Sequence, residues 1–318
     1  MPLTQFVVRR LILLLPVLVG MSIVVFLLMR LVPGDPASVI LGLRATPQGL
    51  AVIRDQLGLD LPITQQYLHW VGNLLQGDLG QDYRSNIPVT TLLADRLPVT
   101  IELTLLALVL ALVIAIPLGV RAGVRQRGMA DKGAMTLGLL GISIPDFWLG
   151  IMLILALSLG LGLFPSSGFV PLSDGLFANL RSLFLPALTL AIGLSAVLVR
   201  VTRAAVAEVQ ERDFVRFLHA KGLRQRAIVY RHVLRNAGIP IVTVIGLQFG
   251  YLLGGAVIVE EVFSLPGVGR LIVSSTLERN YPVVQAGMLV IALMFILVNL
   301  ATDILYAVLN PKIRDAYR

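Results

Sequence analysis

Residues Leu103–Val120 read LTLLALVLALVIAIPLGV and contain no charged side chain. As an α-helix rising 1.5 Å per residue, about 18 such residues approach the ~30 Å thickness of the hydrocarbon core of a bilayer. The whole chain of 318 residues is 57% hydrophobic and only 14% charged, whereas soluble domains are about a quarter charged. This segment therefore predicts a membrane-spanning helix.

Five further uncharged blocks of similar or greater length flank this one. They are Leu11–Met29, Phe147–Ser173, Ser182–Val199, Asn236–Val259 and Asn280–Thr302. The third span must also take in the apolar run 133–145, which puts Asp146 inside it. We expect an all-α integral membrane protein with six transmembrane helices, at about 9–31, 98–124, 134–162, 184–206, 236–259 and 283–308.

The basic residues are unevenly distributed between the segments that join these spans. Most of the 26 Lys and Arg residues fall in alternate segments, which include both termini and 200–235. This positive-inside pattern predicts cytoplasmic termini, and it accounts for the net charge of +8 without a nucleic-acid partner. The chain then divides into the first helix with a long extracytoplasmic loop, 1–97, and a five-helix core, 98–318.

The extracytoplasmic loop itself has local order. Turn residues such as Gly77-Asp78 separate two stretches, Gln48–Leu57 and Thr64–Leu75, which we expect to form short helices. Tyr67, Trp70 and Leu74 then lie along one helical face, suited to a membrane interface.

Residues 211–240 read ERDFVRFLHAKGLRQRAIVYRHVLRNAGIP, and most of them belong to the longest cytoplasmic segment, about 207–235. We expect a helix over 206–218 that continues from the fourth span, a stop at Lys221-Gly222, and a second helix over 224–235. Such a segment either lies on anionic membrane lipid or presents a helical knob to a cytoplasmic partner.

Polar and small residues within the spans are candidates for a translocation path. Asp146 follows a proline in the third span, and it either lines a passage or is a partnered or protonated residue of the bundle. In the fifth span Gly246, Gly250 and Gly254 recur every fourth residue beside Gln248, which leaves room for a solute or for a partner subunit. The similar stripe from Ala107 to Gly123 in the second span is interpreted as tight helix packing.

Signals for catalysis are weak. The chain has no cysteine, no HExxH zinc motif and no GxxxxGK[ST] phosphate loop, and its three histidines lie outside the spans. A membrane serine such as Ser143 therefore has no base within the bilayer. We expect no catalytic residue, no metal site and no cofactor in this chain.

Short motifs along nearly the whole chain resemble one known family. In chain order they are LVPGDPA at 31–37, LGLD at 57–60, GDLG at 77–80, AKGL at 220–223, HVLRNA at 232–237, VFSLPGVGR at 262–270, YPVVQ at 281–285, DILY at 303–306 and NPKIR at 310–314. Together they resemble the permease subunits of ABC-type importers, in the branch that carries dipeptides, oligopeptides, glutathione or nickel.

The resemblance implies a multi-pass protein of the bacterial inner membrane and a set of partners. These would be a second homologous permease, two cytoplasmic ATPase subunits that bind ATP and Mg²⁺, and an extracytoplasmic solute-binding protein. ATPase-independent secondary transport, or a channel, is the alternative. Which solute is carried stays open at this point.

The resemblance also implies that the cytoplasmic segment couples the permease to the ATPases. The coupling residues would be Asp213, Arg216, Phe217, Ala220, Lys221, Gly222, Leu223 and Arg235. One departure concerns Arg216-Phe217-Leu218, where the broad family has Glu-Ala-Ala. Phe217 and Leu218 are expected to add apolar surface at the docking site.

Overall fold

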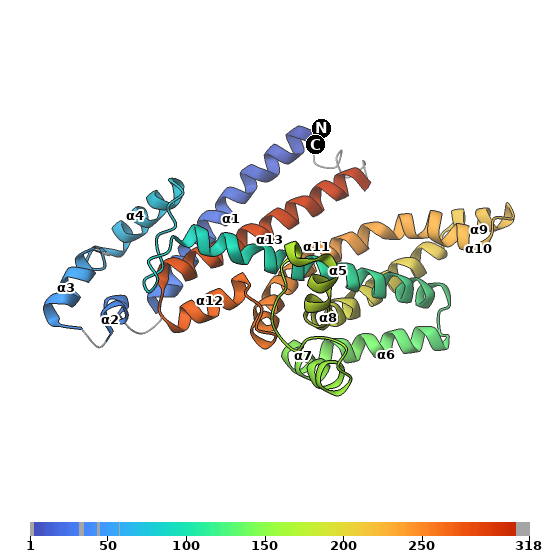
Figure 1. Ribbon diagram of the computed structural model, residues 1–318. Helices are drawn as coiled ribbons and strands as arrows, with labels where there is room; N and C mark the ends of the chain where they lie inside the picture. The colour runs from blue at the N-terminus through green and yellow to red at the C-terminus, as the bar shows by residue number, and fades with distance from the viewer. Residues whose placement is uncertain (1–2, 32–34, 43–44, 57, 310–318) are drawn as a thin grey trace. The chain divides into compact units, whose positions relative to one another are not determined.

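The computed structural model describes residues 3–31, 35–42, 45–56 and 58–309. Part of the LVPGDPA motif and all of NPKIR at 310–314 lie outside these residues. Within them the chain is helical, and the only β-type pairing is an isolated bridge between Gln81 and Pro88. Figure 1 shows the succession of helices.

Five of the described helices are long and apolar enough to cross a membrane, and a bent pair makes a sixth span if counted as one. The five are α1 (Leu3–Leu31), α5 (Val89–Val124), α8 (Leu176–Gln210), α11 (Leu234–Val262) and α13 (Tyr281–Leu309). Five of the six predicted spans are confirmed as apolar helices, and the sixth corresponds to the bent pair. The helices continue past the predicted boundaries into the polar segments.

The third span is the bent pair. Helix α6 (Met129–Ser143) and helix α7 (Asp146–Leu153), which continues as a π-helical stretch over Ile154–Gly160, meet at an angle of 103°. The prediction of one helix over 134–162 is therefore wrong. Pro145 lacks an N–H and its ring obstructs the preceding turn, and Ile144 before it takes the extended conformation, φ −90° and ψ 123°.

The helices fall into two compact bodies. One body comprises 11–100 with 266–294, and it holds the short helices α2 (Pro36–Leu41), α3 (Pro47–Gln56), α4 (Ile63–Leu75) and α12 (Val268–Leu277). Its core gathers Met29, Val89, Leu93, Val268 and Val284 among others. The expected helices of the long loop are confirmed as α3 and α4, up to Gln56 for the first.

The expected face of α4 packs inward within this body. The Phe26 ring of α1 lies 5.2 Å from the Tyr67 ring and 5.7 Å from the Trp70 ring, measured between centroids. The Tyr67 hydroxyl also lies 2.8 Å from Ser22 Oγ. Aromatic stacking and this polar contact fasten α4 to the end of α1.

Among the described residues, the other body comprises 3–10, 101–265 and 295–309, and α8 is its central helix. Helices α6, α7 and α11 all pack on α8, and Figure 1 shows α6, α8 and α11 side by side. In the stripe of α5, Ala107, Ala111 and Ala115 are completely buried. A Cβ placed on Gly119 would come within 2.5 Å of Thr202 Cβ on α8, so the interpretation of this stripe as tight packing is confirmed.

Candidate functional site

The cytoplasmic segment predicted to dock a partner forms a short helix, α9 (Asp213–Ala220), at one end of the α8–α11 pair (Figure 1). Helix α8 ends at Gln210, and Glu211 and Arg212 form a turn through hydrogen bonds to Glu208 O and Val209 O. The expected continuous helix over 206–218 is therefore broken there. The break turns Val215, buried, and the half-buried Phe214 onto the core below.

Helix α9 ends in a Schellman motif centred on Gly222. The Gly222 amide donates to His219 O at 2.9 Å, and the Leu223 amide donates to Leu218 O at 3.3 Å. Gly222 has φ +77°, and a Cβ at this position would meet nothing within 4 Å. A left-handed residue is what this cap requires, and glycine supplies it without strain.

A hydrophobic cluster lies beneath the motif and joins α9 to the long helices. It consists of Val120, Ala205, Val206, Val209, Val215, Ile228, Val229, Val233, Ala237 and Ile241. Leu218 and Leu223, the two residues bridged by the Schellman motif, pack against it. Leu218 therefore contacts the protein's own core, and the expected apolar docking surface reduces to Phe217.

The opposite face of α9 is exposed. Asp213, Arg216, Phe217, Ala220 and Lys221 all lie on this side. Arg216 Nη1 lies 3.7 Å from Asp213 Oδ1, and Lys221 Nζ lies 4.6 Å from the centre of the Phe217 ring. The result is a basic surface with one exposed aromatic ring, held by a turn that packs on the bundle.

Arg235 and the second predicted helix are placed differently from the expectation. Helix α10 (Gln225–Ala227) runs through a π-helical stretch (Ile228–Val233) straight into α11. No separate helix over 224–235 exists, because Ile228, Val229 and Val233 continue the buried stripe of α11. Arg235 is exposed in the first turn of α11.

Asp146 is the first residue of α7. Its carboxylate accepts a hydrogen bond from the Tyr251 hydroxyl of α11, with O–O distances of 3.0 and 2.9 Å. Two glycines make room for it: a Cβ on Gly193 would lie 3.3 Å from Asp146 Oδ1, and a Cβ on Gly255 3.2 Å from Oδ2. The first turn of a helix also favours a carboxylate. The structure thus gives Asp146 a partner, one of the two interpretations left open.

The glycines of α11 divide into two kinds. A Cβ on Gly246 would lie 2.6 Å from Thr302 Cγ2, and a Cβ on Gly250 2.9 Å from Phe295 Cε2, both on α13. These two glycines allow close packing, and the expectation that they leave room for a solute is corrected. Gly254 has nothing within 4 Å of its Cβ position, and Gln248 is half-buried.

Two polar contacts of this body escaped the sequence analysis. One is the role of Tyr251 as donor to Asp146. The other is the ion pair of Asp131 in α6 with Arg203 of α8, in which Asp131 also accepts from the Arg127 amide at 2.8 Å. Both pairs are more than 70 residues apart in sequence, so no local pattern connects their members.

The amino-acid sequence matches the models of two related protein families. Residues 115–315 match the family described as binding-protein-dependent transport system inner membrane component, and residues 3–104 match the N-terminal part described for such membrane components. The two matches together cover almost the whole chain.

Individual relatives agree with the family match. A putative peptide transport system permease protein of Brucella abortus (strain 2308) is 41% identical over 311 residues, 98% of this chain and 99% of the relative. The glutathione transport system permease protein GsiC of Escherichia coli (strain K12) is 42% identical over 310 residues, with the same coverage.

A solved structure shares the fold. A chain of the MetNI methionine ABC transporter, in an inward-facing conformation, superimposes with a TM-score of 0.58 at 19% identity, over 69% of this chain and 96% of that one. A second crystal form of MetNI gives a TM-score of 0.59 at 18% identity, over 70% and 97%.

Proposed function

This chain belongs to the family of binding-protein-dependent transport system inner membrane components, and from that premise we propose that it imports short peptides in an ATP-driven complex. It is a multi-pass permease subunit of the ABC importer family in the inner membrane. Its relatives are transport permease subunits, in accord with a role in passage and not in chemistry.

The proposed solute class is the short peptide, including glutathione. Two relatives that align over 98% of the chain bear the names of a peptide permease and a glutathione permease. Glutathione is itself a small modified peptide, so one description covers both. Nickel has no such support.

The proposed partners follow from the family and from the lack of a phosphate loop. Two cytoplasmic ATPase subunits would bind and hydrolyse ATP with Mg²⁺, a second homologous permease would complete the passage, and an extracytoplasmic binding protein would deliver the solute. Both termini would lie in the cytoplasm. Asp146, Gln248 and Gly254 are our candidates to line the passage.

The coupling proposal rests on one observation: one side of α9 packs on the protein's own helices, and the other side is exposed. Its inner side, through Val215, Leu218 and Leu223, packs on residues of α8 and α11, so a displacement of α9 moves these helices with it. Its outer side offers Arg216, Phe217 and Lys221 to a partner. Coupling requires an element that both sites displace, and α9 with the Gly222 turn is our candidate for it.

A charged substitution at Gly222 tests the coupling proposal. Gly222→Asp points a side chain into open space, so the protein is expected to insert normally while the ATPase loses its docking surface. The measurement is the amount of Walker-A ATPase retained on the tagged permease in mild detergent, together with uptake of radiolabelled trialanine or glutathione in cells. We expect more than a 10-fold loss of both.

The matched control is Gly162→Asp. Gly162 has φ +64° and equally open space at its Cβ position, so the backbone strain and the added charge are comparable, but it lies between the π-helical stretch 154–160 and α8. This variant should retain the ATPase and transport. Full retention and uptake by Gly222→Asp would refute coupling through α9, and uptake by the lone chain in liposomes without ATP would refute the importer assignment.

A further inference from the structure

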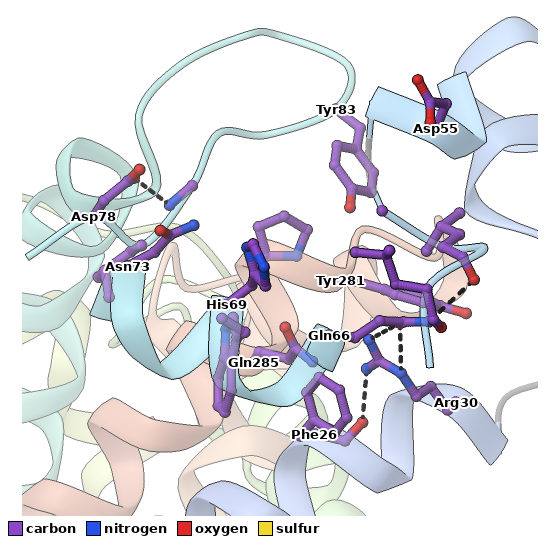
Figure 2. A pocket seen from close by; sticks show the side chains of 17 residues that line it. Phe26, Arg30, Asp55, Gln66, His69, Asn73, Asp78, Tyr83, Tyr281 and Gln285 are labelled. Carbon is purple, nitrogen blue, oxygen red and sulfur yellow. Dashed lines mark hydrogen bonds between the residues drawn. The ribbon is translucent and has the colours of Figure 1, made fainter. Parts of the chain in front are cut away.

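A cavity of about 450 Å³ lies within the body formed by 11–100 and 266–294. Its walls come from the end of α1, from α3 and α4, from residues 78–83 and from the start of α13. Figure 2 shows the polar side chains that converge on it, among them Arg30, Gln66, Asn73, Tyr83, Tyr281 and Gln285. Phe26 and Trp70 supply apolar wall. A small ligand typically binds in a cavity of this size, apolar in part with a few convergent polar groups.

Arg30 is held in a fixed position at this cavity. Its Nε and Nη2 donate to Gln66 Oε1 at 3.2 and 2.6 Å, and its Nη1 donates to Phe26 O at 3.1 Å. Gln66 is anchored in turn, because its Nε2 donates to Leu59 O and Leu61 O at 3.0 and 2.8 Å. The guanidinium carbon lies 3.4 Å from the centre of the Phe26 ring. Figure 2 shows these bonds.

The carboxylates of Asp55 and Asp78 also line the cavity, but neither forms an ion pair with Arg30, so the charge of Arg30 is left without an anion. A guanidinium has five N–H donors, of which three are used, and no described carboxylate forms an ion pair with Arg30. A half-buried cation of this kind is stabilised when a carboxylate accepts its free donors.

Gln285 supplies a second unfulfilled group. Its exposed fraction is 5%, it lines the cavity, and its side-chain amide makes no hydrogen bond to another described residue. The amide borders the open space of the cavity, so its donor and acceptor are available to a ligand. The Tyr83 hydroxyl is a further donor, since burial raises the pKa of Tyr83 and keeps the phenol protonated.

We propose that this cavity binds the carboxylate end of a short peptide. Arg30 contacts the carboxylate, and Gln285 pairs with the adjoining peptide group, to which a primary amide is complementary as both donor and acceptor. The proposal rests on the proposed function for the choice of a peptide. It adds a recognition site in the body formed by 11–100 and 266–294.

The test uses the fluorescence of Trp70, which lines the cavity. The chain has two tryptophans, so Trp148→Phe leaves Trp70 as the single reporter in the full-length protein in lipid nanodiscs. Titration with trialanine should give a saturable change in fluorescence. Trialanine amide, which lacks the carboxylate, should bind at least 10-fold more weakly. Equal binding of the two peptides, or no binding of trialanine, would overturn the proposal.

The variant Gln285→Leu separates recognition from folding. The Gln285 amide makes no hydrogen bond to another described residue, so a leucine of similar size removes no hydrogen bond of the fold and the thermal unfolding midpoint should not fall. Binding of trialanine should nonetheless weaken at least 10-fold. The control is Arg54→Gln. Arg54 is exposed, pairs with Asp35 and does not line the cavity, so this variant should bind trialanine as tightly as the parent protein does.

The two proposals fail separately. If Gln285→Leu binds trialanine as the parent does, the cavity proposal is wrong, while retention of the ATPase still supports the importer. If trialanine binds through Gln285 but no ATPase is retained on the parent chain, the cavity proposal stands and the importer complex does not.

Discussion

At the scale of single residues, the environment of the Asp146 carboxylate depends partly on the local sequence and partly on tertiary packing. Pro145 ends the preceding helix, so Asp146 begins α7, where the helix dipole favours a negative charge. The space around the carboxylate comes from Gly193 and Gly255 on two other helices, and its hydrogen bond comes from Tyr251. Only the first of these contributions is local in sequence.

Tyr251→Phe should weaken the contact of α7 with α11. The substitution removes the one hydroxyl that donates to Asp146, and in a double-mutant cycle with Asp146→Asn we expect a coupling energy of about 1–2 kcal/mol. Unfolding in sodium dodecyl sulfate titrations measures it. The control is Tyr230→Phe, at an exposed tyrosine that makes no hydrogen bond to a described residue. An equal loss of stability in Tyr251→Phe and Tyr230→Phe would contradict a stabilising hydrogen bond between Tyr251 and Asp146.

At the scale of helices, glycine positions that look alike in sequence behave differently. Gly119 of α5 faces Thr202 of α8 with no room for a methyl group, whereas Gly254 of α11 faces open space. Both belong to stripes of small residues at every fourth position. Such a stripe allows another helix to approach closely. Whether a side chain of a neighbouring helix fills the space above each glycine depends on how the helices pack.

Gly119→Ala and Gly254→Ala should therefore have opposite effects. The first forces its Cβ into Thr202 and should destabilise the protein by about 1–3 kcal/mol. The second meets nothing within 4 Å and should be neutral or stabilising by up to about 1 kcal/mol, since alanine favours a helix. Thermal unfolding of both variants in the same detergent measures the difference. A destabilised Gly254→Ala would mean that another subunit fills that space.

At the scale of the whole molecule, the orientation in the membrane remains a prediction from charge. The long loop between α1 and α5 should be extracytoplasmic, and the turn at Gly222 should be cytoplasmic. Alkaline phosphatase, which is active only outside the cytoplasm, should be active when fused after Gln81 and inactive when fused after Gly222. The reverse pattern would invert the topology and place α9 out of reach of a cytoplasmic ATPase.

The sequence by itself determined the class of protein, the apolar helices long enough to span a membrane and the site of the helix cap at Gly222. These depend on local quantities: an uncharged stretch long enough for a bilayer, and a glycine placed where a helix must end. The same local signals located α3 and α4 in the long loop.

Only the tertiary structure decided which side chains meet. Three features depend on residues distant in sequence: the packing of Thr302 and Phe295 against Gly246 and Gly250, the inward packing of Leu218, and the pairing of Asp131 with Arg203. The convergence of Arg30, Gln66 and Gln285 on one cavity is of the same kind. Apolar length is a property of one segment, whereas a contact requires the placement of two segments, which packing alone fixes.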